Sequence, residues 1–165
     1  SLHDALPIST IQVPNLPTQH PRHNTALGNM IVERYQLPVT AGLVNGVDIA
    51  TGDVIILGIL PAGWRLMPQF AKIVVSDAFG TGVTGTVGFA YIDGVDDTAV
   101  PQDADYFLLS NTLAATVALS GNNTAVTAVT LPKSAYLTVT LGGTSHDASA
   151  AAMDVYICAV NSGLL

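Results

Sequence analysis

The sequence predicts an all-β domain, a jelly-roll-like β-sandwich with an extended proline-rich arm on its N-terminal side. Three observations predict it. Strand-forming and turn-forming residues dominate the composition, apolar residues alternate with a period of two in several segments, and clusters of turn residues separate these segments at fairly regular spacing.

The composition indicates one domain whose surface is partly covered by other protein. The chain has 165 residues, of which 49% are hydrophobic and only 10% charged. This length is enough to bury a core, but a monomer in solution normally carries more charge. Each apolar run stops short of the roughly 18 residues of a membrane-spanning helix. We therefore expect burial in an assembly and no membrane partner.

The charge balance argues against nucleic-acid binding. The net charge is −7, from 12 acidic and 5 basic residues. Proteins that bind nucleic acid need lysine and arginine to neutralise phosphates. Here the basic residues are scattered along the chain, at Arg22, Arg34, Arg65, Lys72 and Lys133.

The first 29 residues divide into two segments. Residues 1–8, SLHDALPI, correspond to the translation of a short-read sequencing adapter, and we give them no functional weight. Residues 9–29 hold three prolines within eight positions, which excludes a helix or a central strand. They predict an extended arm, with a disordered tail as the alternative. If the arm lies across a neighbouring subunit, its interface candidates are Ile11, Val13 and Leu16.

Residues 30–165 form the predicted sandwich domain. In Ala135–Leu141, for example, three apolar side chains share one face of the strand and Tyr136 and two threonines share the other. Turn sequences such as Asn45-Gly46 and Asp93-Gly94 separate the segments. A short helix within Tyr106–Ala118 is a weak alternative there. The predicted strands are Ile31–Leu37, Asp53–Leu60, Arg65–Ser76, Thr84–Ile92, Tyr106–Leu109, Leu113–Leu119, Ala125–Leu131, Ala135–Leu141 and Met153–Val160.

The strand Asp53–Leu60 is apolar on both faces, so it must be covered on both. Either it lies within the sandwich under a loop, or it faces a subunit interface. The second possibility makes Ile55, Leu57 and Ile59 interface candidates. Trp64, after the turn that follows, is either an interface anchor or a core anchor.

The acidic loop after the strand Thr84–Ile92 is a weak candidate for metal binding. Asp93, Asp96 and Asp97 offer oxygen ligands of the kind that calcium prefers. Their spacing matches no EF-hand loop, and Asp and Gly are ordinary turn residues. We favour a solvated loop and expect no cofactor.

Catalytic signatures are missing from the sequence. His20 and His23 are two histidines without the further ligands of a zinc site. His146 and Asp147 are adjacent, but no motif supplies a nucleophile beside them. Cys158 is the one cysteine and lies in a strand pattern, which predicts a buried, inert thiol. We expect that the chain is not an enzyme.

Four segments resemble small structural proteins of tailed bacteriophages. GDVIILGILPAG, from Gly52 to Gly63, resembles a GD-hydrophobic-LG-x-LPAG segment of that group. The segments Val87–Gly94, Asp105–Leu108 and Thr130–Val139 are similar to the same group. The resemblance extends from about Ile31 to Ile157 and consists of turns and strands.

This resemblance implies a virion component. It implies a capsid cement or decoration protein that binds between subunits of the major capsid protein, on the capsid surface, as a homo-oligomer and most often a trimer. The alternative is a receptor-binding or glycan-binding jelly-roll module of a phage tail or fibre. That alternative predicts an exposed aromatic cluster beside the loop from Asp93 to Asp105.

Overall fold

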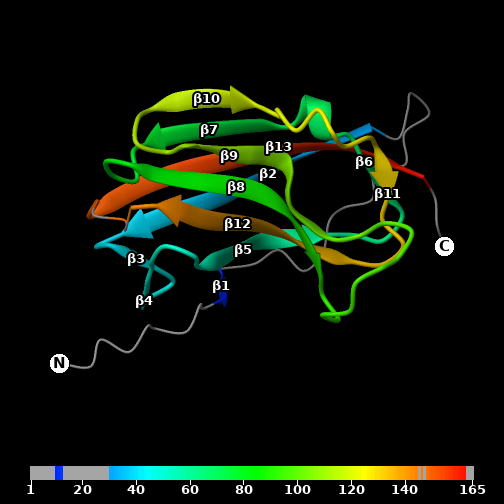
Figure 1. Ribbon diagram of the computed structural model, residues 1–165, viewed down its shortest axis with the longest axis horizontal. Coiled ribbons are helices and arrows are strands. Elements are labelled where there is room, and N and C mark those ends of the chain that lie inside the picture. The colour runs from blue at the N-terminus through cyan, green and yellow to red at the C-terminus, as the bar shows by residue number, and fades with distance from the viewer. Residues whose placement is uncertain (1–9, 13–29, 145, 147, 163–165) are drawn as a thin grey trace.

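Two β-sheets packed face to face make up the body of the protein (Figure 1). The computed structural model describes residues 10–12, 30–144, 146 and 148–162. Within these residues the one helical element is the short 3₁₀ turn η1, Pro68–Phe70. In this part of the chain no helix is long and apolar enough to cross a membrane.

Sheet A contains five strands in the described part of the chain. Its β1 pairs in parallel with β5, and all its other pairings are antiparallel. In spatial order the strands are β1 (Thr10–Gln12), β5 (Val54–Leu60), β12 (Ala135–Gly143), β8 (Val83–Tyr91) and β9 (Asp103–Thr112).

Sheet B contains eight strands in the same described residues. Its main path runs β10 (Val117–Ser120), β7 (Lys72–Asp77), β13 (Ala150–Asn161), β2 (Met30–Thr40), β3 (Leu43–Val44) and β4 (Val47–Asp48). Beside this path, β6 (Trp64–Leu66) pairs with β13 and with β11 (Val129–Thr130).

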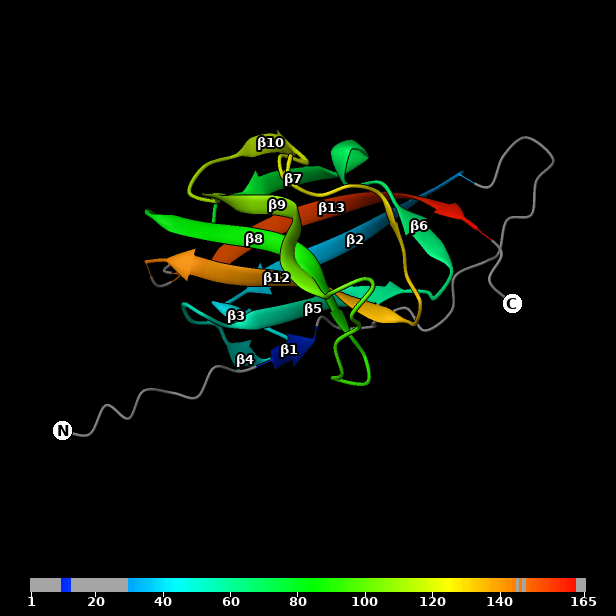
Figure 2. The same ribbon diagram turned by 45° about the vertical axis from the view of Figure 1, so that its right-hand side comes forward.

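The connections confirm the predicted jelly roll. Four strands of sheet B, in the order β2-β13-β7-β10, lie against four of sheet A, in the order β5-β12-β8-β9. The chain passes from β2 to β5, β7 and β8, and later from β9 to β10, β12 and β13, so among these eight strands it changes sheet at every step except from β8 to β9. This is the eight-stranded double Greek key, and Figure 2 shows the two layers from a second direction.

The core lies between the sheets and follows the predicted alternation. In β12, Leu137 and Val139 are fully buried and point inward. In β13, Met153, Val155 and Ile157 do the same from the opposite sheet. These two strands thus place every second side chain in the core.

A β-bulge resets the alternation in β5. Leu137 of β12 pairs with Gly58, but the next residue of β12, Thr138, pairs with Ile56, so Leu57 has no partner of its own. A bulge of this kind shifts the strand by one residue. Ile55 and Leu57 therefore belong to the core before the bulge and Leu60 belongs to it afterwards, while Ile59 is half-buried.

Glycine at position 58 makes room for a buried tyrosine. A Cβ there would overlap the ring of Tyr35, which reaches across from β2. The Tyr35 hydroxyl donates a hydrogen bond to the carbonyl oxygen of Ile59 at 3.1 Å. Burial raises the pKa of this phenol above its usual range, so it remains a donor.

Four predicted elements are wrong in detail. The strand expected over Arg65–Ser76 is interrupted by η1, because Pro68 cannot continue a strand ladder. The helix considered within Tyr106–Ala118 is absent: β9 ends at Thr112 and β10 begins at Val117, so the strand predicted over Leu113–Leu119 also begins later than expected. Of Ala125–Leu131 only β11 is a strand.

The Asn45-Gly46 turn was predicted, but the small hairpin of β3 and β4 around it was not. Val44 pairs with Val47 across this two-residue turn, and both turn residues have positive φ, 51° and 75°. These values are typical of a type I′ hairpin.

Candidate interaction surface

The acidic loop between β8 and β9 folds upon its own backbone. The Asp96 carboxylate accepts hydrogen bonds from the backbone N–H groups of Asp97 and Gln102, at 2.8 and 2.7 Å. The Asp97 carboxylate accepts from those of Ala99 and Val100, both at 2.9 Å. These oxygens organise the turn, and the described residues contain no group of three or more His, Cys, Asp or Glu side chains placed to hold a metal ion.

Lys133 fastens this loop to the body of the domain. Its ammonium donates to both oxygens of Asp93, at 2.7 and 3.0 Å, and to the carbonyl oxygen of Val95. It also lies 4.6 Å from the ring centre of Tyr91, a cation–π contact. The hydrogen bond from Lys133 holds the pKa of Asp93 below its ordinary value.

The Lys133→Met variant is expected to raise the pKa of Asp93 towards its ordinary value of about 3.9. Because the folded-state pKa is depressed, the pair stabilises the fold above about pH 4, and this contribution is lost as the pH falls through the folded-state pKa. NMR titration of the Asp93 carboxyl measures the change. Lys72→Met serves as the control and should leave that titration unchanged, and an unshifted Asp93 in Lys133→Met would contradict the contact.

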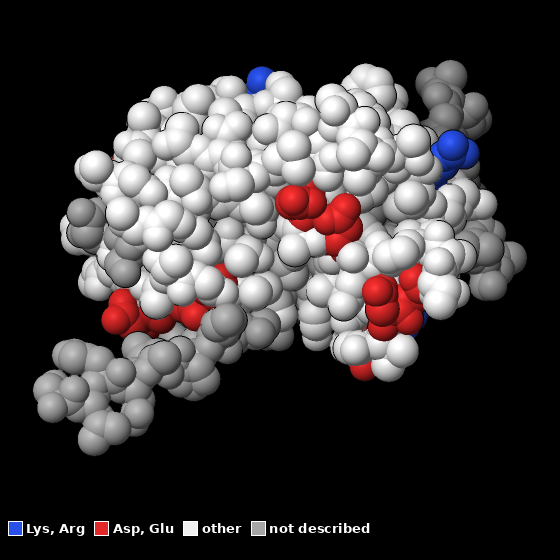
Figure 3. Space-filling view, in the orientation of Figure 1, with Lys and Arg blue, Asp and Glu red and all other residues white. Residues whose placement is uncertain are grey.

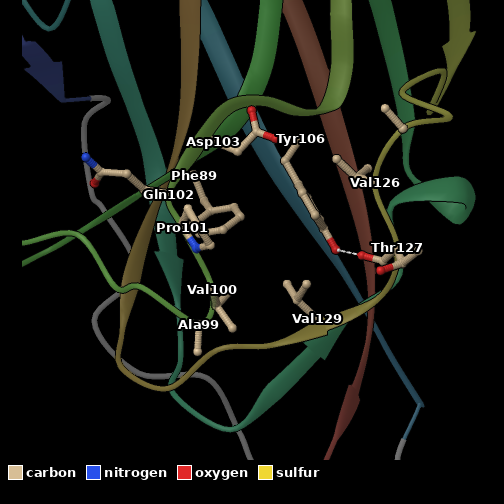
Figure 4. A pocket seen from close by; sticks show the side chains of 11 residues that line it. Phe89, Ala99, Val100, Pro101, Gln102, Asp103, Tyr106, Val126, Thr127 and Val129 are labelled. Atoms are coloured by element: carbon tan, nitrogen blue, oxygen red, sulfur yellow. Dashed lines mark hydrogen bonds between the residues drawn. The ribbon is translucent and has the colours of Figure 1, made fainter.

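A groove of about 320 Å³ opens between this loop and the segment that precedes β11 (Figure 4). Its two walls are linked by the Tyr106 hydroxyl, which donates to the carbonyl oxygen of Thr127 at 2.6 Å. The Tyr91 hydroxyl donates to the carbonyl oxygen of Val100 at 2.6 Å and holds the loop wall. We call this feature the acidic groove and define it by Val100, Pro101, Asp103, Tyr106, Val126 and Val129.

Acidic side chains lie in and beside the loop wall of the groove. Asp103 lines it, and a hydrogen bond with Asp103 raises the pKa of the neighbouring Asp105, with burial as a smaller cause. In Figure 3 acidic side chains gather over the β8–β9 loop and near the start of β9, with little blue beside them. Five negative charges therefore lie on this side of the molecule, against the one positive charge of Lys133. They are those of Asp93, Asp96, Asp97, Asp103 and Asp105.

The aromatic side chains beside the acidic loop are buried, contrary to what the glycan-binding alternative predicts. Phe89 makes edge-to-face contacts with Tyr91 and Tyr106, at centroid distances of 5.8 and 5.3 Å, and Tyr106 does so with Phe107. All four are at most 3% exposed. Burial raises the pKa of both tyrosines to about 12, which keeps their hydroxyls protonated as donors.

The opposite side of the molecule carries basic and apolar side chains. Lys72, Tyr156 and Arg34 are paired across β7, β13 and β2, so their side chains share one face of sheet B. The neighbouring Ile73 and Val155 point into the core, which places the row on the solvent side. Arg34 binds Asp154 at 2.9 Å on this face.

A second row adds the apolar part of this surface. Arg65, Val160 and Met30 are paired across β6, β13 and β2. Met30 and Val32, at successive outward positions of β2, are 63% and 64% exposed. We call this surface the outer face of sheet B and define it by Met30, Val32, Arg34, Arg65, Lys72 and Tyr156.

The predicted interface residues lie elsewhere. Ile55, Leu57 and Trp64 are at most 4% exposed in the single chain, which favours the core position that was the alternative for each, and their interface role stays a prediction. Ile59 is half-buried and stays a candidate. Ile11 lies in β1, where no side chain is described, and Val13 and Leu16 lie outside the described residues.

The described residues that were considered for catalysis, His146 and Cys158, pack against the body of the domain. His146 Nδ1 is 2.8 Å from the carbonyl oxygen of Phe79, and its ring meets that of Phe79 edge to face. Cys158 is buried, and burial raises the pKa of its thiol, which disfavours the reactive thiolate. Asp147, His20 and His23 lie outside the described residues.

Comparison with known proteins finds solved structures that are similar to this chain. The chain is similar to one from the capsid of Ralstonia phage GP4, with a TM-score of 0.65, 16% identity, and coverage of 93% of this chain and 99% of that one. A chain of the cyanophage Pam1 capsid asymmetric unit has a TM-score of 0.47 and 15% identity, with 88% and 99% covered. No protein-family model matches, and the search of curated proteins gives no match. The likeness to the GP4 chain shows a shared fold.

Proposed function

We propose that this chain is a virion structural protein of a tailed bacteriophage. It acts as a capsid cement or decoration protein, binds on the capsid surface between subunits of the major capsid protein, and is itself a homo-oligomer, a trimer. It performs no catalysis in this role. The observation that carries the proposal is the shared fold with a chain of the GP4 capsid, which covers almost the whole of both chains.

The surface properties support a binding role. The exposed apolar side chains of β2, together with few charges, are typical of a face covered by protein. A standard contact buries about 800 Å² on each partner, which is about a tenth of the accessible surface of 8747 Å². One chain therefore has room for contacts with several subunits.

The proposed role has a simple thermodynamic basis. A ligand stabilises the state to which it binds, by an amount that grows with the logarithm of its concentration over its Kd. A protein whose site exists only where capsid subunits meet in the expanded lattice therefore stabilises that lattice. At a free concentration about 100 times the Kd, each site gains about 2.7 kcal/mol.

Binding to assembled shells tests the proposal. Expanded shells are prepared from the major capsid protein of the phage that carries this chain, mixed with the purified chain and sedimented. We expect the chain to sediment with the shells to a saturating ratio and to raise their melting temperature. Unexpanded shells and unassembled major capsid protein are the controls and should bind less. Equal binding to unassembled subunits, or no binding to expanded shells, would contradict the proposal.

A further inference from the structure

We propose that the acidic groove of one copy of this chain binds the outer face of sheet B of a second copy, with Met30 and Val32 at the groove. The proposal rests on the proposed function, because it gives the contact that would join the copies of a homo-oligomer. The two surfaces belong to different faces of the sandwich, so the contact is head to tail.

The charges of the two surfaces are complementary. The groove side carries five aspartates against Lys133, and the outer face of sheet B carries Arg34, Arg65 and Lys72 against Asp154. Four of the five basic residues of the chain are described, and three of these four lie on that one face. The net local charges are thus about −4 and +2. Opposite potentials of this kind favour association and fix its register.

The apolar parts are complementary as well. The groove is lined by Val100, Pro101, Val126 and Val129. The outer face of sheet B presents Met30 and Val32, more than 60% exposed. A flexible methionine side chain fills irregular apolar space well.

The positions of the charges fit around this apolar pair. Arg34 follows Val32 by two residues on the same strand, about 7 Å away, and Arg65 is two strands from Met30, about 10 Å away. Asp103 lines the groove, and the loop aspartates stand beside Val100 on the same, loop-side wall. Each apolar contact would thus be bordered by opposite charges.

Charge-neutral variants that keep the fold test the contact. Asp97→Asn with Asp103→Asn retains an oxygen that accepts the backbone hydrogen bonds of the loop, and it removes one charge from the groove and one from the loop beside it. Arg65→Gln with Lys72→Gln removes two charges from the outer face of sheet B. Sedimentation velocity should show self-association of the unaltered chain that weakens about tenfold in each variant. It should also weaken as NaCl rises from about 50 to 500 mM.

A mixture of variants distinguishes a head-to-tail contact from a symmetric one. Equal amounts of the groove variant and the sheet B variant should form one-to-one heterodimers, because each supplies the intact surface that the other lacks. Asp48→Asn with Asp77→Asn is the matched control and should associate like the unaltered chain. Met30→Ser should weaken association about tenfold, and Val47→Ser, on an exposed strand elsewhere, should not.

Three results would overturn the inference: a chain that stays monomeric at all concentrations, variants that associate as before, or a mixture without heterodimers. Shell binding separates this failure from failure of the proposed function. If the chain binds expanded shells but the copies do not associate, the head-to-tail contact and the trimer are wrong, while the cement role stands. If the copies associate as expected but expanded shells bind nothing, the cement role is wrong.

Discussion

The Gly88→Ala variant is expected to lose about 3 kcal/mol or more of unfolding free energy. A Cβ at this position of β8 would overlap the carbonyl oxygen of Asp103 and the backbone of Ala104. Both are main-chain atoms, so no rotation of a side chain relieves the overlap, and β9 must move away from β8. Urea unfolding followed by the fluorescence of the single tryptophan, which is buried, measures the loss.

Gly94→Ala is the matched control for this variant. It adds the same methyl group in the loop that follows β8, at a φ of 70° with nothing within 4 Å. The expected loss there is the conformational cost alone, about 1 kcal/mol. If both variants lost the same amount, the close crossing of β9 over Gly88 would be incorrect.

The Phe89→Ala variant is expected to lose about 3 to 5 kcal/mol. Phe89 is 1% exposed, and its ring lies edge to face with Tyr91 and Tyr106, the tyrosines whose hydroxyls hold the two walls of the groove. Removal of the ring leaves a cavity beneath the groove as well as in the core. Urea unfolding gives the loss in stability, and weaker self-association at a temperature where the variant is folded would report the damaged groove.

Phe70→Ala is the matched control for that change. Phe70 is 69% exposed on η1, so its removal should change stability by less than about 0.5 kcal/mol. An equally large loss from both variants would mean that the aromatic cluster is not a principal part of the core.

The sequence predicts the long strands well because their alternation is local. Residues 135–141 and 153–160 were predicted as strands, and β12 and β13 contain them with inward side chains as expected. The phase of β5 could not be predicted, because the bulge at Leu57 depends on pairing with β12, nearly 80 residues later in the chain. Hydrophobicity alone does not tell which neighbour covers Ile55.

The candidate surface was predicted only in part. The acidic loop is visible in the sequence as a run of aspartates, and its role as a self-contained turn follows from backbone hydrogen bonds that composition does not reveal. The groove was missed because its second wall, residues 125–129, meets the first through the hydroxyl of Tyr106. The exposure of Met30 and Val32 could have been found from the sequence, because both are apolar residues at the outward positions of an alternating strand.

The pairing of β2 with β13 also sets when the protein folds during its synthesis. Arg34 and Asp154, partners on these strands, are 120 residues apart in the chain. At about 5 to 20 residues per second, β2 leaves the ribosome roughly 6 to 24 s before β13 is available. During this interval β2 lacks its principal neighbour, and its inward side chains Tyr35 and Leu37 lack their cover. The nascent chain is therefore prone to aggregate until β13 emerges, and native folding waits for that strand.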